Sequence, residues 1–334
     1  MAAEQDFNVS NPSYTLFMCI LYLTLGTIAI FANTVNIIVF WTNRELRMNY
    51  LFHVALDAGE IVNGISYILT GLGRGTQFLL GNFATPMTVH QCFYTRYWPI
   101  PLILGTEIPA WMTILTSAER IIAVHKPGSY KKIFSTQMKI FFIAIIFCCI
   151  LLSLGGAAFS AYGSTRQTST QHCAIISSTS KFYSTFHFTF VPFAYVSSFI
   201  SLCIIARLHK KASRGIQTTG KKGPQLNIFI VMTAFDIVLC AAPSIVMIGA
   251  SWGWFTPNDL VVSLTYSTTG FLSLCHTGMN AIFHSEYRKQ IRRIFARLAG
   301  MSIAEKTLFA PSQFIRSSVS PATINVSKIT PIVN

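Results

Sequence analysis

The chain has 334 residues, of which 52% are hydrophobic and 11% are charged, whereas about 25% of residues are charged in ordinary soluble domains. Together with a mean hydropathy of +0.51, this composition excludes a soluble enzyme, a nucleic-acid binder or a secreted disulfide scaffold. The apolar residues are also clustered, because residues 7–43, 140–165, 182–206 and 260–285 contain no Asp, Glu, Lys or Arg. A helix crosses a bilayer with about 20 mostly apolar residues. We therefore expect an all-α, polytopic membrane protein.

Hydropathy and helix-breaking residues together predict seven membrane-spanning helices. They cover residues 14–40, 50–72, 96–123, 139–162, 183–207, 224–250 and 259–283. Residues 75–95 are uncharged but contain Thr, Gln, Asn, His and Pro86, and we interpret them as an extracellular loop. Residues 1–13 are the predicted outer tail. Residues 299–334 are rich in Ser and Thr and contain three prolines, a composition typical of a disordered tail.

The net charge of +14 is distributed unevenly over the predicted connections. Basic residues gather in every second connection and at the C-terminal end, and the other connections hold just Arg74, Arg96, Arg166 and Lys181. Cytosolic connections of membrane proteins carry the excess of Lys and Arg. The N-terminus is thus predicted outside and the C-terminus in the cytosol of a plasma-membrane protein. Anionic membrane lipid or an acidic cytosolic partner accounts for the basic residues, and no nucleic acid is needed.

Residues 285–298 have the pattern of an amphipathic helix. Their apolar side chains share one face, and five Lys or Arg residues lie elsewhere: the apolar set is Tyr287, Ile291, Ile294, Phe295 and Leu298. Such a helix lies on the membrane surface, here on the cytosolic side. A plain basic tail is the alternative.

Two cysteines fall in predicted extracellular connections, Cys92 before the third span and Cys173 between the fourth and fifth. Because the outside is oxidising, we predict a disulfide between them; two free thiols are the alternative. The other six cysteines lie within spans, where thiols pack as apolar groups. Asn8 begins an Asn-Val-Ser sequence on the outer tail, which makes it a candidate glycosylation site.

Four acidic residues fall inside the predicted spans: Asp57, Glu60, Glu107 and Asp236. An ionised side chain is costly in the bilayer, so these groups should face the bundle interior. One hypothesis makes them a proton or cation path, and the other makes them satisfied interior groups. The nearby His276 and His284 have no third ligand at a suitable spacing, so we predict no metal site.

The segment from Glu119 to Pro127, Glu-Arg-Ile-Ile-Ala-Val-His-Lys-Pro, resembles the Asp/Glu-Arg-Tyr box of rhodopsin-like G-protein-coupled receptors. The resemblance covers about residues 14–298 and implies a seven-span bundle followed by an eighth helix. It also implies that Arg120 is a switch, paired with Glu119 at rest and meeting the G protein in the active state. Further positions similar to family motifs form an implied polar core and two implied hinges. The core comprises Asn33, Glu60 or Asp57, His276 and Asn280, and the hinges are Pro192 and Pro243.

Several family positions are altered. The sixth-span tryptophan is Ala241, the amine-binding aspartate position is Leu102, and the retinal lysine position is Gly270. The residues thus argue against an amine receptor or an opsin. A receptor with so few family motifs is similar to nematode chemosensory serpentine receptors. Whether Glu60 binds sodium or is a protonated or hydrogen-bonded acid stays open.

Ligand contacts in such a receptor would come from the outer halves of several spans. The candidates by depth are Trp98, Leu102, Thr106, Phe186, Phe190, Trp252 and Tyr266. Their aromatic and apolar character suits a small, mostly apolar ligand, although core packing explains it equally well.

The sequence contains none of the catalytic motifs Gly-x-Ser-x-Gly, His-Glu-x-x-His or a phosphate loop. We therefore expect no enzyme activity and no cofactor. The leading hypothesis is a receptor that activates a heterotrimeric G protein. The alternatives are a transporter or channel that uses the four interior acids, and a non-signalling membrane scaffold.

Overall fold

The structure is a computed structural model that describes residues 12–213, 224–256, 258–283 and 285–298. The predicted tails, apart from residues 12 and 13, lie outside the described residues, as do Asn8 and His284. The chain divides into two units, Met1–Ile291 and Arg292–Asn334. The first unit contains the helix bundle, and of the second the structure describes the last turns of one helix.

Among the described residues, seven helices have 25 residues or more. They are α1 (Pro12–Thr42), α3 (Leu51–Leu79), α5 (Pro99–His125), α7 (Thr136–Ala161), α9 (Lys181–Ser213), α10 (Pro224–Ser251) and α11 (Asp259–Phe283). At a rise of about 1.5 Å per residue, 25 residues exceed the roughly 30 Å hydrocarbon core of a bilayer. Each predicted span therefore corresponds to one helix that is long enough to cross the hydrocarbon core of a bilayer.

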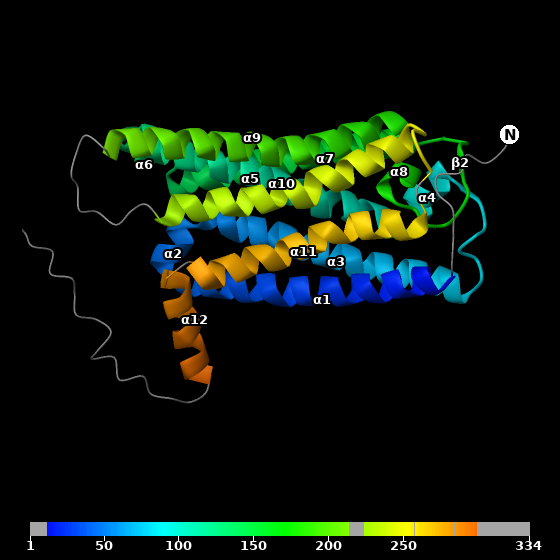
Figure 1. The fold of residues 1–334 in the computed structure, drawn as a ribbon, viewed down its shortest axis with the longest axis horizontal. Helices are drawn as coiled ribbons and strands as arrows, with labels where there is room; N and C mark the ends of the chain where they lie inside the picture. Colours follow the sequence, from blue (N-terminus) through cyan, green and yellow to red (C-terminus); the bar gives the residue numbers. More distant parts are fainter. Residues whose placement is uncertain (1–11, 214–223, 257, 284, 299–334) are drawn as a thin grey trace, which may run out of the picture. The chain divides into compact units, whose positions relative to one another are not determined.

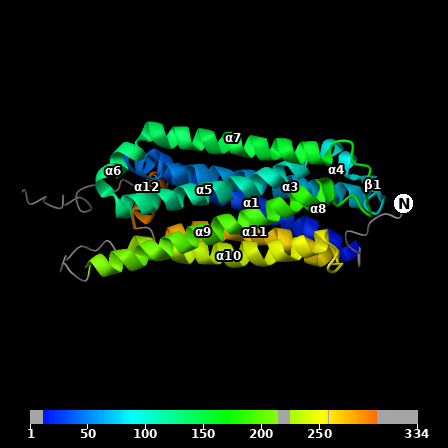
Figure 2. The ribbon, with the colours of Figure 1, turned by 90° about the horizontal axis from the view of Figure 1, so that it is seen from above.

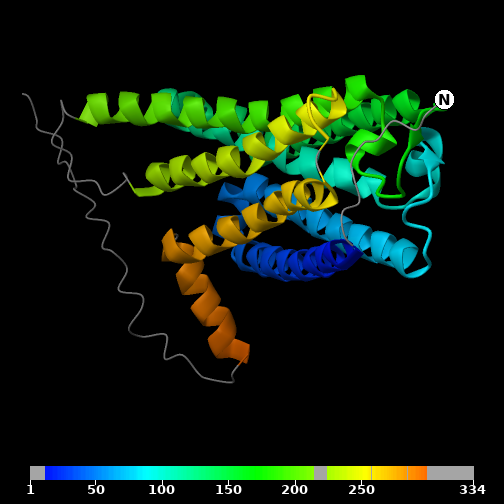
Figure 3. The ribbon, with the colours of Figure 1, turned by 45° about the vertical axis from the view of Figure 1, so that its right-hand side comes forward.

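By length and composition, five helices of the described part are apolar enough to cross a membrane: α1, α5, α7, α9 and α10. The other two, α3 and α11, contain more polar residues. Both pack against α1, as Figures 1 and 3 show. The polar side chains of α3 and α11 are in large part buried within the bundle, which is the placement expected for polar groups in a membrane helix.

Short elements connect the long helices at the two ends of the bundle (Figures 1 and 2). One end carries α2 (Arg44–Asn49) and α6 (Pro127–Ile133). The opposite end carries a two-stranded antiparallel sheet of β1 (Met87–Thr88) and β2 (Gln167–Thr168), together with α4 (Val89–Thr95) and α8 (Ile175–Ser178).

The prediction of a loop over residues 75–95 is wrong at both of its ends. Helix α3 continues to Leu79, and α4 begins at Val89. Helix α4 begins with a capping box. The Thr88 hydroxyl oxygen accepts a hydrogen bond from the Gln91 backbone N–H (3.1 Å), and the Gln91 side-chain oxygen accepts one from the Thr88 backbone N–H (3.0 Å).

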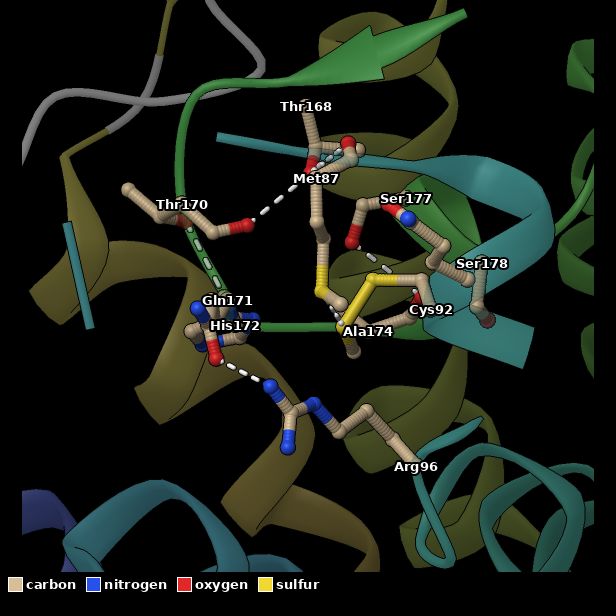
Figure 4. The surroundings of a disulfide bond; sticks show 12 residues. Met87, Cys92, Arg96, Thr168, Thr170, Gln171, His172, Ala174, Ser177 and Ser178 are labelled. Atoms are coloured by element: carbon tan, nitrogen blue, oxygen red, sulfur yellow. Dashed lines mark hydrogen bonds between the residues drawn. A yellow bond between two sulfur atoms is a disulfide. The ribbon is translucent and has the colours of Figure 1, made fainter. Parts of the chain in front are cut away.

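The predicted disulfide between Cys92 and Cys173 is confirmed. It joins α4 to the loop before α8, with a Cα–Cα distance of 5.4 Å. Figure 4 shows that the Cys92–Cys173 disulfide lies near Met87 and Ala174, and that the Arg96 side chain donates a hydrogen bond to the Gln171 side chain of the same loop. Residues 171–179, which include Cys173 and α8, are called the disulfide loop below. Its residues 173–179 are each at most 3% exposed. The disulfide therefore fixes a loop segment that is itself part of the core.

Helix α12 (Ser285–Leu298) has the bounds of the predicted eighth helix. In the first unit, the Tyr287 hydroxyl donates to Asn36 of α1, and the Gln290 side-chain amide donates to Thr42 (3.1 Å). These two bonds attach the start of α12 to the end of α1.

We expect Cys92→Ser to lower surface expression and thermal stability more than Cys203→Ser, a free cysteine of α9. Loss of a native disulfide costs about 2–5 kcal/mol in small secreted domains, whereas a half-buried thiol is replaced cheaply. Surface labelling and the melting temperature measure the difference. In the parent protein, an alkylating reagent should label Cys92 and Cys173 only after the protein has been reduced, and mass spectrometry detects the label. Labelling of both without reduction would contradict the assignment.

Candidate functional site

The Glu119–Arg120 pair lies near the end of α5, six residues before the helix ends at His125. Lys126 follows as the cap, and Pro127 is the first residue of α6. Proline is favoured at this helix position because its missing N–H would be unpaired anyway. The residues after the pair thus end α5 and start α6, and α6 packs against α5.

Glu119 is 1% exposed and binds two side chains from other helices. Its Oε1 lies 2.7 Å from Lys139 Nζ of α7, and it accepts a 2.8 Å hydrogen bond from the Tyr130 hydroxyl of α6. Sequence analysis predicts Arg120 as the resting partner of Glu119. In the structure the carboxylate is held by Lys139 and Tyr130.

Lys139 connects Glu119 to the end of α2. Its Nζ also donates to the backbone oxygens of Met48 (3.2 Å) and Asn49 (3.4 Å), and it lies 5.5 Å from the centre of the Phe52 ring. The ammonium has three N–H donors, so the carboxylate and the two carbonyls can use all of them. This one buried lysine ties α5, α7 and the α2–α3 connection together.

Tyr130 acts as a hydrogen-bond donor at any physiological pH. Its burial and its hydrogen bond to Glu119 raise the pKa of the phenol to about 12. The hydroxyl therefore keeps its proton and holds α6 to the carboxylate.

Arg120 lies on the neighbouring face of α5. Its guanidinium lies 5.5 Å from the centre of the Tyr50 ring, a cation–π geometry. The side chain also lines a cavity of about 40 Å³ whose wall includes Thr116, Thr233, Asp236 and His276. Helices α3, α5, α9, α10 and α11 all contribute to this wall. Arg120 and Asp236 are thus charged groups in the wall of a cavity to which five helices contribute.

At the other side of this cavity, His276 of α11 lies between two acids. Its Nε2 is 2.8 Å from Asp236 Oδ1 of α10, and its Nδ1 is 3.5 Å from Glu60 Oε1 of α3. All three residues are at most 4% exposed. The imidazole thereby links α3, α10 and α11 through charged or proton-sharing contacts.

The remaining predicted core residues form two further contacts between helices. Asn33 donates to Ser273 of α11 (2.5 Å). The side-chain amide of Asn36 donates hydrogen bonds to the Asp57 carboxylate (3.2 Å) and to the Thr277 hydroxyl (3.0 Å). Asn36 was not among the predicted core residues, although it lies three residues after Asn33 on the same helix. The predicted member Asn280 is half-buried and takes part in none of these contacts.

Glu107 belongs to a separate cluster toward the disulfide end of α5. Its Oε1 accepts from Ser153 (2.9 Å) and Tyr183 (3.1 Å), and it lies 3.0 Å from His187 Nδ1. Thr106 Oγ1 lies 3.0 Å from the other nitrogen of His187. Glu107 thus joins α5, α7 and α9 through one carboxylate oxygen, while its Oε2 is buried without a hydrogen-bond partner.

The predicted ligand-pocket residues do not form one lining. Trp98, Leu102 and Tyr266 pack in one buried cluster with residues 173–176 of the disulfide loop. Phe186 and Trp252 are 50% and 54% exposed. Phe190 stacks on Phe186 and makes a tilted ring contact with Trp111, and Thr106 belongs to the Glu107 cluster. The chain's own loop thus occupies the space beside the buried candidates, which sequence depth alone does not predict.

The prolines expected as hinges lie inside helices, Pro192 in α9 and Pro243 in α10.

Among the described residues, no three His, Cys, Asp or Glu side chains are grouped so that they could hold a metal ion. No protein-family model matches the chain, and no curated protein matches its sequence.

We expect Glu119→Gln to lower the melting temperature by about 10 °C, because removing one partner of a buried pair costs about 3–5 kcal/mol. The double variant Glu119→Gln/Lys139→Met should recover at least half of this loss, since it removes the unpaired ammonium as well. The control, Glu119→Gln/Lys132→Met, changes an exposed lysine of α6 and should recover nothing. Equal melting temperatures for the two double variants would show that the pair is energetically unimportant.

Proposed function

We propose that the chain is a G-protein-coupled receptor of the rhodopsin-like type in the plasma membrane. In this proposal all seven long helices span the bilayer, the disulfide end faces outward, and α12 lies on the inner membrane surface. The receptor binds a small extracellular molecule and promotes nucleotide exchange on a heterotrimeric G protein. The single observation that carries the proposal is the setting of Glu119 and Arg120, one fixed to α6 and α7 and the other facing a cavity shared by five helices.

The setting of Glu119 gives α5 a stable inner end. Its carboxylate holds Lys139 and Tyr130, so α5, α6 and α7 form one firmly connected group. The opposite wall of the Arg120 cavity comes from Leu202 of α9 and Thr233 of α10. An outward movement of α9 and α10 would therefore widen the cavity while Arg120 stays in place.

In the widened cavity, the guanidinium could meet an inserted segment of the G protein. Arginine carries five N–H donors in a rigid fork and is always charged, so it can bind the carbonyl oxygens at the C-terminus of a partner helix. A helix C-terminus also carries partial negative charge. A few kcal/mol of preference for the open state is enough to shift such an equilibrium.

The ligand side of the proposal is a chemosensory role. The sequence lacks the residues that bind amines or retinal, and the disulfide loop fills the space beside Trp98, Leu102 and Tyr266. A ligand that acts here would press on this loop or on the helix ends around it. The Cys92–Cys173 bond would pass that displacement to α4 and the start of α5.

A transporter or channel is the second candidate, and one observation favours it. Asp236, Glu60 and His276 gather in the bundle interior, next to the cavity that reaches Arg120. Such a group could pass protons. Glu107, however, binds a different histidine, His187, and shares no side chain with this group.

We expect Arg120→Ala to reduce G-protein nucleotide exchange by about tenfold, the equivalent of about 1.4 kcal/mol. Glu119→Gln should also reduce exchange, because it loosens the group of α5, α6 and α7 that keeps Arg120 in place. Exchange is measured in membranes that contain several Gα types, with a ligand screen on the parent protein. Lys126→Ala, at an exposed position beyond the helix end, is the control and should behave as the parent.

Surface levels of all variants have to match for this comparison. If Arg120→Ala and Glu119→Gln both signal as the parent does, Arg120 is an anchoring residue and the receptor mechanism is wrong. A proton or cation flux in proteoliposomes that Asp236→Asn abolishes would favour the transporter.

A further inference from the structure

The exposed side chains of α1 form an apolar stripe that ends at a tryptophan. Phe31, Ile38 and Trp41 are 71%, 45% and 52% exposed, and their spacing places them on one face of the helix. Another face of α1 is buried, where Asn33 contacts α11 and Asn36 contacts α3. In the membrane placement proposed above, the stripe faces acyl chains. Trp41 then lies at the inner membrane surface, a depth at which tryptophan is enriched.

Two arginines of α2 lie where this stripe ends. The Arg47 guanidinium is 5.0 Å from the centre of the Trp41 ring, a cation–π geometry. Arg44 is exposed and lies three residues before Arg47, so the two side chains share a face of α2. Met48, the residue after Arg47, is 41% exposed. The end of α1 and α2 thus present two guanidinium groups directly beside an apolar surface.

The surroundings of these arginines are strongly basic. Residues 41–49 and 125–139 together contain six Lys or Arg residues and one acid, Glu45. Of the six, only Lys139 is buried, and it is paired with Glu119. The other five are exposed or half-buried. Their combined positive potential attracts an anion to this end of the bundle.

A phospholipid with a net negative charge matches both parts of this surface. The fork of N–H donors in a guanidinium matches the oxygens of a phosphate, and an acyl chain of the same molecule can follow the apolar stripe. A zwitterionic lipid carries a cation beside its phosphate, which the arginines repel. A soluble anion or an acidic protein segment would use the arginines but not the stripe.

We propose that Arg44, Arg47 and Trp41 form a binding site for an anionic phospholipid of the inner leaflet. Its phosphate is held by the two arginines, and one acyl chain lies along Ile38 and Phe31. The site rests on the proposed membrane placement of α1, and it does not depend on coupling to a G protein.

The test is the melting temperature of the full chain in detergent, followed by circular dichroism. Short-chain phosphatidylserine should raise it by about 3 °C more than phosphatidylcholine with the same acyl chains. Glycerophosphoserine and a hexaglutamate peptide are anionic but have no acyl chain, so they should leave the melting temperature unchanged.

Variants separate a site from a general attraction between charges. Arg44→Gln/Arg47→Gln should abolish the preference for phosphatidylserine. Trp41→Leu should at least halve it, although this variant keeps every charge. The control Arg288→Gln/Lys289→Gln removes the same number of charges from the start of α12 and should keep the preference. All five substituted side chains are exposed or half-buried, so the variants should fold as the parent does.

Equal shifts with phosphatidylserine and phosphatidylcholine would overturn the proposal. So would a full preference in Trp41→Leu, or an equal loss of preference in the two double variants, because either result would reduce the effect to general attraction. A shift with glycerophosphoserine or hexaglutamate would overturn it in favour of a soluble anion or an acidic protein. None of these measurements involves nucleotide exchange, so the lipid site can fail while the receptor mechanism stands.

Discussion

A charged side chain inside a helix bundle has to find its partner inside the same bundle, because the surrounding apolar phase offers none. This constraint organises the molecule more than any apolar contact does. Glu119 pairs with Lys139, Glu107 with His187, and Asp236 with His276. In every case the partner comes from another helix. The pairs therefore fix which faces of the helices meet, whereas apolar packing alone would tolerate many rotations.

The same constraint separates the bundle into firm and adjustable parts. The disulfide loop and the Glu107 cluster hold one end, and the contacts of Glu119 hold α5, α6 and α7 at the other. Between them lies a cavity with Arg120 in its wall and α9 and α10 on its far side. Helices on the wall of a cavity can move at a lower cost than helices joined by a buried ion pair, which is why the proposed coupling movement involves α9 and α10.

The long helices were predictable from sequence because uninterrupted apolar runs leave few alternatives, and the disulfide because two cysteines alone fell outside the runs. The partners of the interior acids were not predictable in this way. Lys139 is 20 residues from Glu119, and its contact depends on how α7 is rotated against α5, which apolar runs without a polar face do not determine. For α4 a local signal existed: Thr88 and Gln91 have the spacing of a capping box. Arg74 counted as an ordinary outer basic residue, and only its burial distinguishes it.

The proposed receptor requires that α3 and α11, although polar, cross the membrane with the five apolar helices, with their polar side chains buried in the bundle. Labelling of single introduced cysteines in intact cells with a membrane-impermeant maleimide tests this claim most directly. Asn82→Cys follows α3, Ser129→Cys follows α5, and both positions are exposed. With seven spans, Asn82→Cys is labelled from outside, and Ser129→Cys is labelled only after permeabilisation. If just the five apolar helices cross, with the N-terminus outside, the two positions exchange behaviour, and that result would contradict the account.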